Sequence, residues 1–149
     1  MYINPFLKAS AYVFEQLRLP CRIGKPSIKS SPLSGKDVVT IVGITGDIRG
    51  QMYFGGSISP VLEIVSAMMG GTVSSMDSIA QSAFSELSNM ICGNAMSIFA
   101  REGISLDITP PALIQGQQIK VSAVKMNVLS IPIILNGSNE VEMNIVFQE

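Results

Sequence analysis

Residues 76–102 most constrain the fold, because their pattern predicts one long amphipathic helix in the middle of the chain. Asp77 or Ser75 can cap its start, and Gly103 follows its end, where glycine commonly stops a helix. At about 100° per residue, the apolar side chains gather on one side, at Ala80, Ala83, Leu87, Met90, Ile91 and Ile98. A helix with a single apolar stripe needs a sheet or further helices to cover that stripe.

Two shorter helices and several strands flank this segment. Residues 4–19 predict a first helix that Pro20 stops, and residues 61–69 predict a short helix with Ser59 as its N-cap. Residues 36–57 predict a β-hairpin around a Gly-Asp turn. Further strands are predicted at 21–32 (a single edge strand), 119–126, 128–135 and 141–147. This order predicts an α+β domain, with an antiparallel β-sheet and helices packed on one of its faces.

The size and charge of the chain limit the class of protein. Its 149 residues suffice for one core and no linker divides them, so we expect a single domain over residues 1–149. The net charge of −1, without a basic cluster, gives no footprint for nucleic acid binding. No apolar run reaches the ~20 residues of a membrane helix and no secretory signal is apparent. We therefore expect a cytoplasmic protein that binds neither membrane nor nucleic acid.

Histidine is absent from the sequence. Ser-His-Asp and Cys-His catalysis are therefore excluded, and a zinc site of the usual Cys/His type is not expected. Cys21 and Cys92 are expected to be reduced thiols, with Cys92 a core residue rather than a nucleophile. Any chemistry must then use carboxylates, amides, hydroxyls, lysines or a borrowed metal.

The side of the long helix opposite its apolar stripe, here called the outer stripe, carries Ser82, Glu86, Asn89, Gly93 and Ser97. A carboxylate can hold a cation, and a carboxamide can hold a water molecule by donating and accepting hydrogen bonds together. That pairing suits hydrolysis of a phosphoryl group that another protein presents. The remaining members are small, which fits either a close helix crossing inside the domain or a flat docking surface for a partner.

The run FSELSNMICG at residues 84–93 resembles the signature helix of the CheC/CheX/FliY family of chemotaxis phosphatases. The family motif is Glu, two residues, then Asn, with Ser or Asp four residues before the Glu and a proline farther downstream. Glu86, Asn89 and Ser82 match it, and the proline pair at 110–111 lies close to the expected spacing. The resemblance covers nearly the whole chain.

The family includes members with two motif copies on pseudo-symmetric helices and CheX-like members with one copy. A second copy would lie on the first helix, where Glu15 is present but Arg18 stands in place of the Asn. The resemblance therefore implies a single-motif, CheX-like protein, and it leaves open whether this helix holds a degenerate second site. CheX-like proteins are homodimers joined partly through their sheets, which implies a homodimer here.

The resemblance also implies an enzyme, a phosphatase that hydrolyses the phospho-aspartate of a CheY-like response regulator and terminates a chemotaxis or other two-component signal. Asn89 would orient the attacking water, and Glu86 would pair with the regulator's active-site lysine. Ser82, Ser85 and Gly93 would form the surface that docks the partner. The protein would need no metal or cofactor of its own, because the regulator supplies Mg²⁺.

Two other functions compete with hydrolysis. The chain could be a non-catalytic binding module that docks on a response regulator or on a signalling or flagellar protein, since a fold alone does not prove activity. It could also be a purely structural dimerising domain. The structural function predicts that Glu86 and Asn89 are buried or bonded within the domain, so their exposure separates it from the other two.

Overall fold

Along the described chain, one helix precedes four strands, and two further helices precede another four strands. The computed structural model describes residues 3–30, 34–121, 127–137 and 139–148. The helices are α1 (Asn4–Gln16), α2 (Ile58–Met69) and α3 (Ser78–Arg101). The strands are β1 (Arg22–Ile23), β2 (Ser27–Lys29), β3 (Ser34–Gly46), β4 (Arg49–Gly56), β5 (Leu106–Ile108), β6 (Ala112–Lys120), β7 (Val128–Ile134) and β8 (Glu140–Gln148).

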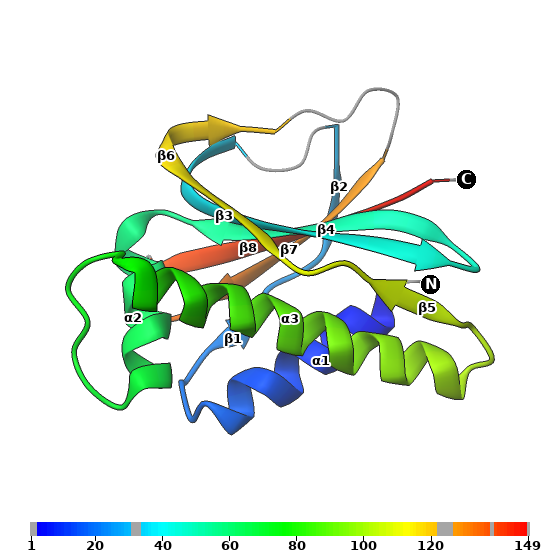
Figure 1. Cartoon of the computed structure of the whole chain (residues 1–149), viewed down its shortest axis with the longest axis horizontal. Coiled ribbons are helices and arrows are strands. Elements are labelled where there is room, and N and C mark those ends of the chain that lie inside the picture. The colour runs from blue at the N-terminus through cyan, green and yellow to red at the C-terminus, as the bar shows by residue number, and fades with distance from the viewer. Residues whose placement is uncertain (1–2, 31–33, 122–126, 138, 149) are drawn as a thin grey trace.

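All of these strands belong to one antiparallel sheet. Among the described residues it has eight strands, in the order β1-β7-β8-β4-β3-β5, while β2 also pairs with β7 and β6 pairs with β3. The helices α1, α2 and α3 lie together on one face of the sheet, with α3 running roughly along the direction of β3 and β4 (Figure 1). The predicted α+β class, with helices on one sheet face, is confirmed.

Aromatic side chains fill the core between α3 and its neighbours. Phe84 of α3 stacks on Phe54 of β4, with ring centroids 5.1 Å apart. Phe6 of α1 meets Phe99 of α3 edge to face at 5.9 Å. All four rings are fully buried, and burial of each contributes about 1.5–3 kcal/mol. These contacts hold α3 against both the sheet and α1.

A buried hydroxyl pair fixes the rotation of α3 on the sheet. The hydroxyls of Thr40 on β3 and Ser88 on α3 share a hydrogen bond, and Thr40 also donates to the carbonyl of Phe54. Both Thr40 and Ser88 are fully buried. Because an unpaired buried hydroxyl is costly, a rotation of α3 that separated the pair would be unfavourable. The outer stripe is thereby kept facing away from the sheet.

The predicted ends of the long helix are confirmed. Asp77 accepts a hydrogen bond from a backbone N–H of the first turn at 2.8 Å, and Gly103 has a φ of +84° just beyond the helix. The predicted apolar stripe faces the core, although Ala83, Met90 and Ile98 are half-buried at its margin. A helix–sheet interface therefore explains this stripe.

The predicted start of α2 is wrong. The helix begins after Ser57, which adopts an extended conformation, and not after Ser59. The carboxylate of Asp37 on β3 accepts a hydrogen bond from the Ile58 N–H, so the helix can begin earlier than its own sequence indicates. Its predicted end is confirmed, because Gly70 follows Met69 in a left-handed conformation.

The hairpin predicted over residues 36–57 is confirmed, because β3 pairs with β4. The strands predicted at 128–135 and 141–147 are confirmed as β7 and β8, which pair with each other. The other strand predictions need correction. The strand predicted at 119–126 belongs to β6, which starts earlier at Ala112, and 122–126 lie outside the described residues. β5 was not predicted at all. In place of one edge strand at 21–32, the very short β1 and β2 both pair with β7, because Gly24 and Pro26 interrupt the run.

Candidate functional site

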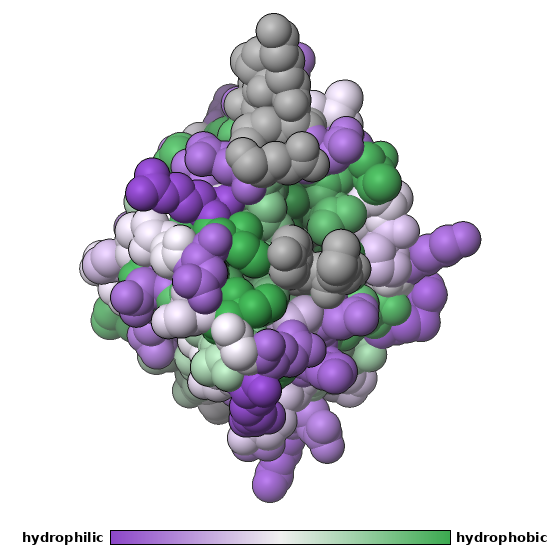
Figure 2. Space-filling model, turned by 90° about the vertical axis from the view of Figure 1, so that its right-hand side faces the viewer, coloured by the Kyte–Doolittle hydropathy of each residue, from purple (hydrophilic) through white to green (hydrophobic). Residues whose placement is uncertain are grey.

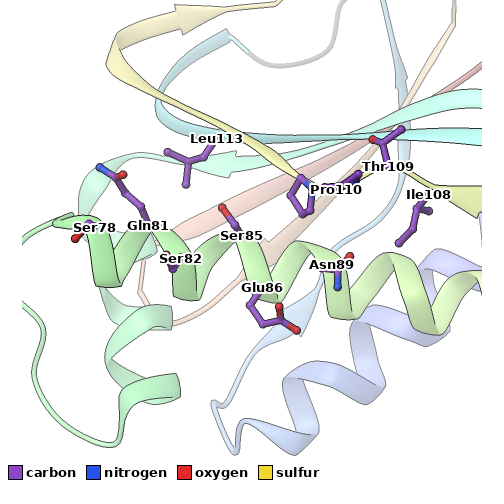
Figure 3. A pocket seen from close by; sticks show the side chains of 11 residues that line it. Ser78, Gln81, Ser82, Ser85, Glu86, Asn89, Ile108, Thr109, Pro110 and Leu113 are labelled. Atoms are coloured by element: carbon purple, nitrogen blue, oxygen red, sulfur yellow. The ribbon is translucent and has the colours of Figure 1, made fainter.

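The outer stripe of α3 presents its two candidate functional groups to solvent. Glu86 is exposed and Asn89 is half-buried, and they project from the helix one turn apart (Figure 3). Within the part of the chain that the structure describes, neither side chain makes a hydrogen bond or an ion pair. The purely structural function predicts the opposite, so that prediction is wrong.

A cleft of about 690 Å³ lies beside these two residues. Its far side is the segment that joins β5 to β6, where Pro110 and Pro111 form what we call the proline wall (Figure 3). Ile108, Thr109 and Leu113 complete that side. The α3 side is lined by Ser78, Gln81, Ser82, Ser85, Glu86 and Asn89. The structure thus brings four of the predicted site residues into one cleft.

An irregular strand pairing creates the proline wall. Ile44 of β3 pairs with Ile108, and Ile41 pairs with Ala112. Three residues of the β5–β6 connection therefore oppose two residues of β3, which is the pattern of a β-bulge. Figure 3 shows Pro110 between the strand and α3, facing the helix. The bulge converts an edge strand into one side of a cleft.

Gly93 lies on the outer stripe beyond Asn89 and does not line the cleft. A Cβ atom built at Gly93 would meet no other atom within 4 Å in the described residues. A close helix crossing inside the domain is therefore wrong as an explanation of this glycine. The space beside it is open to a partner, and its docking role stays a prediction.

The nucleophilic and metal-binding potential of the rest of the molecule is small. Cys92 is fully buried, and burial raises the pKa of its thiol to about 12, so it is protonated at neutral pH. The predicted core position of Cys92 is confirmed. Among the described residues there is no group of three or more His, Cys, Asp or Glu side chains that could hold a metal ion.

A second hollow, of about 720 Å³, lies at the end of the sheet near the β3–β4 turn, where apolar side chains gather on the surface (Figure 2). Ile28, Leu129 and Phe147 contribute to its lining. Its one carboxylate, Asp47, already accepts a hydrogen bond from the Ser105 N–H at 2.7 Å, as expected of a turn residue. Asp47 is therefore already engaged within the described residues, unlike Glu86 beside α3.

The place of a possible second motif copy is not a site. α1 ends at Gln16, earlier than predicted, because Leu17 is its C-cap and Arg18 has a left-handed φ of 56°. Glu15 is therefore on the helix and Arg18 is beyond it. The two side chains do not project one turn apart from a helix, as Glu86 and Asn89 do.

Sequence reasoning missed the residues that close the cleft. Gln81 donates hydrogen bonds to the Met76 carbonyl at 3.2 Å and to the Gln115 side chain on β6 at 3.0 Å, which joins the two sides of the cleft at one end. Gln81 lies one turn before Ser85, so its helical spacing was a usable signal. Thr109 and Leu113 gave no such signal, because their position depends on the strand pairing.

Comparison with known proteins identifies relatives along the whole chain. The family model "Chemotaxis phosphatase CheX" matches residues 38–140. The CheY-P phosphatase CheX of Thermotoga maritima is 33% identical over 138 residues, covering 89% of this chain and 88% of that protein. The crystal structure of the chemotaxis protein CheX from Desulfovibrio desulfuricans has a TM-score of 0.89 at 25% identity over 99% of both chains.

A chain of the CheX–CheY–BeF3–Mg²⁺ complex from Borrelia burgdorferi is also similar. Its TM-score is 0.86 at 30% identity, and the match covers 100% of this chain and 99% of that chain. The residues matched by the family model include both sides of the cleft. No helix within the described residues is long and apolar enough to cross a membrane.

Proposed function

The chain belongs to the CheX family of chemotaxis phosphatases, and on that premise we propose that it hydrolyses the phospho-aspartate of a CheY-like response regulator. The observation that carries the proposal is the unpaired Glu86–Asn89 pair at a cleft that is open to a partner. The relative in Thermotoga maritima is a CheY-P phosphatase, and the Borrelia CheX is found with CheY, BeF3 and Mg²⁺.

Asn89 positions the nucleophile in this proposal. Hydrolysis of an acyl phosphate requires a water molecule in line with the bond to the aspartate oxygen. The carboxamide of Asn89 can donate and accept hydrogen bonds at once, which fixes the orientation of that water. A bond forms between the water oxygen and phosphorus, and the bond from phosphorus to the aspartate oxygen breaks. The products are inorganic phosphate and the regulator's free carboxylate, with one proton of the water passing to phosphate or solvent.

Glu86 fixes the register of the complex. Its carboxylate has no partner within the described residues, so it can pair with the regulator's lysine without breaking an existing bond. An ion pair formed next to the reacting centre orients the two proteins, and orientation is a large source of rate acceleration. The Mg²⁺ ion in this scheme belongs to the regulator, and this chain contributes no ligand to it.

The docking surface consists of small residues around the two functional side chains. Ser82 is exposed and Ser85 is half-buried in the cleft, while Gly93 leaves open space one turn beyond Asn89. Small side chains allow a partner's backbone to approach α3 closely, so that Glu86 and Asn89 reach furthest into the regulator. The proline wall faces the same partner from the other side of the cleft.

We further propose that the protein works as a homodimer in the cytoplasm, where a phosphorylated response regulator would be found. Family membership supports this proposal. Sedimentation equilibrium at micromolar concentration measures the mass in solution. A mass of twice 15.9 kDa is expected, and a monomer throughout the concentration series would contradict the proposal.

The phosphatase activity is tested with a phosphorylated CheY-like regulator and Mg²⁺, by following phosphate release. We compare wild type with Asn89→Ala and with the Glu86→Ala/Asn89→Ala double variant. The matched control is Asn94→Ala. Asn94 is on the same helix, but its side chain donates a hydrogen bond to the backbone carbonyl of Met90. Wild type and the control should accelerate release, and the other two variants should not.

The same samples decide between catalysis and simple binding. If wild type binds the phosphorylated regulator but leaves its lifetime unchanged, the chain is a binding module on a response regulator. If it neither binds nor accelerates release across the CheY-like regulators of its own cell, the proposed function is wrong.

A further inference from the structure

The proline wall lacks the backbone hydrogen bonds that hold a regular strand to its neighbour. Proline has no N–H group, so neither Pro110 nor Pro111 can donate to β3. The bulge also displaces the wall from regular pairing between Ile41–Ala112 and Ile44–Ile108. A wall built this way would be loosely held unless another group restores the missing hydrogen bonds at β3.

Thr109 supplies these missing hydrogen bonds, because it bonds to one residue of β3 through both its backbone and its side chain. The Gly43 N–H donates to Thr109 Oγ1 at 2.8 Å, and the Thr109 N–H donates to the Gly43 carbonyl at 2.9 Å. The threonine hydroxyl takes the place of the carbonyl that a regular ladder would offer to Gly43. Thr109 directly precedes Pro110, so these two hydrogen bonds fix the position at which the proline wall begins.

Gly43 is matched to this contact. A Cβ atom at Gly43 would lie 3.1 Å from both Thr109 Oγ1 and Thr109 Cγ2. Only about one in ten real Cβ contacts is that close, so a side chain at Gly43 would require Thr109 to shift by a few tenths of an ångström. The glycine on β3 and the threonine on the connection therefore form one unit, which we call the Gly43–Thr109 latch.

We propose that Thr109 is a positioning residue for docking, acting through the proline wall. The latch holds the wall at a set distance from Glu86 and Asn89 and so defines the width of the cleft that receives the regulator. This inference rests on the proposed phosphatase function. The catalytic side chains are on α3, and neither hydrogen bond of the latch involves that helix. Loss of the latch therefore weakens docking and leaves the chemical step intact.

The test compares variants that remove or keep the hydroxyl of Thr109. Thr109→Val keeps the β-branched shape and removes the acceptor, and Thr109→Ser keeps the acceptor. Thr45→Val is the matched control, because Thr45 is an exposed threonine on β3 whose hydroxyl makes no hydrogen bond in the described residues. Two readouts are needed: KM and kcat for phosphate release with phosphorylated regulator at a series of concentrations, and hydrogen exchange of the Gly43 amide in the free protein.

Thr109→Val should raise KM on the order of tenfold with kcat nearly unchanged, a change set by one lost hydrogen bond. Its Gly43 amide should exchange faster than in wild type. Thr109→Ser and Thr45→Val should match wild type in both readouts. Partial unfolding would instead lower the apparent kcat and leave KM unchanged, so the two effects are separable.

Three results would overturn the inference. Faster Gly43 exchange in Thr109→Val with an unchanged KM would show that the latch exists but does not set docking. Unchanged exchange would show that the hydroxyl does not hold Gly43. Equal loss in Thr109→Ser would show that the hydroxyl is not the cause. An inactive wild type is a different failure, because it removes the proposed function while the exchange measurement still decides whether the latch is present.

Discussion

The two faces of α3 differ in how their polar groups are treated. On the inner face, the hydroxyl of Ser88 is fully buried and is bonded to Thr40 of β3. On the outer face, Glu86 and Asn89 have no partner within the described residues. One face is thus complete within the domain and the other is left incomplete. We therefore expect stability and activity to be separable on this helix, and substitutions on each face test that separation.

The largest expected effect is on the inner face. Phe84→Ala removes a ring that is fully buried and stacked on Phe54. It should lower the free energy of unfolding by about 3–5 kcal/mol, as measured by chemical denaturation. Tyr12→Ala is the control, because Tyr12 is 53% exposed, and its effect should stay within about 0.5 kcal/mol. A Phe84→Ala protein as stable as wild type would contradict the assignment of the inner face to stability.

The next effect is on the outer face and concerns rate. Asn89→Ala should lower kcat for phosphate release by roughly 10²-fold or more, since the attacking water loses the group that orients it. The free energy of unfolding should change by no more than about 0.5 kcal/mol, because the Asn89 side chain makes no hydrogen bond to a described residue. Steady-state kinetics and denaturation on the same preparation check both statements. Parallel losses of activity and stability would mean that the outer face is not independent of the core.

A smaller effect is expected where the two faces are coupled. Ser88→Ala removes the hydroxyl that pairs with Thr40, which keeps its second hydrogen bond to the Phe54 carbonyl. The cost should be about 1 kcal/mol in unfolding free energy. Ser97→Ala, on the exposed outer stripe, should be nearly neutral and serves as the control. If Ser88→Ala were neutral too, the hydroxyl pair would not be what fixes the rotation of α3.

The smallest effect is expected at Gly93, where one substitution should increase stability and weaken docking. Gly93→Ala places a methyl group in open space within a helix, which should stabilise the fold by up to about 1 kcal/mol and raise Tm by about 2–4 °C. The same methyl group stands on the proposed docking surface and should raise KM severalfold. Thermal denaturation and phosphate-release kinetics measure the two changes. A higher Tm with an unchanged KM would remove Gly93 from the docking surface.

The inner side of this comparison was largely predictable from sequence. The limits of α3 follow from Asp77 and Gly103, whose local chemistry acts within one turn. Its two faces follow from helical periodicity alone. The start of α2 was missed because its first N–H is satisfied by Asp37, which is distant in sequence. Local rules hold where the deciding contact is local and fail where another strand supplies it.

The far side of the cleft was not predictable in the same way. The proline pair at 110–111 was noticed as the downstream proline of the family motif, but not as one side of a cleft. Its direction depends on a three-against-two pairing with β3, and neither strand shows that offset by itself. The role of Thr109 depends further on Gly43, whose backbone it bonds. Half of the cleft therefore comes from a tertiary register that the periodicity of one segment does not encode.

The proline wall has one more consequence, for how this edge of the sheet meets other chains. β5 and β6 lie at the edge of the sheet beyond β3, and an open edge invites another strand to join it. Pro110 and Pro111 lack the N–H groups that such a strand would need, and the bulge breaks the regular spacing. A protein that must repeatedly bind and release its partner is thus protected at this point from irreversible edge-to-edge aggregation. Contact at the cleft is left to side chains, which can separate again after each turnover.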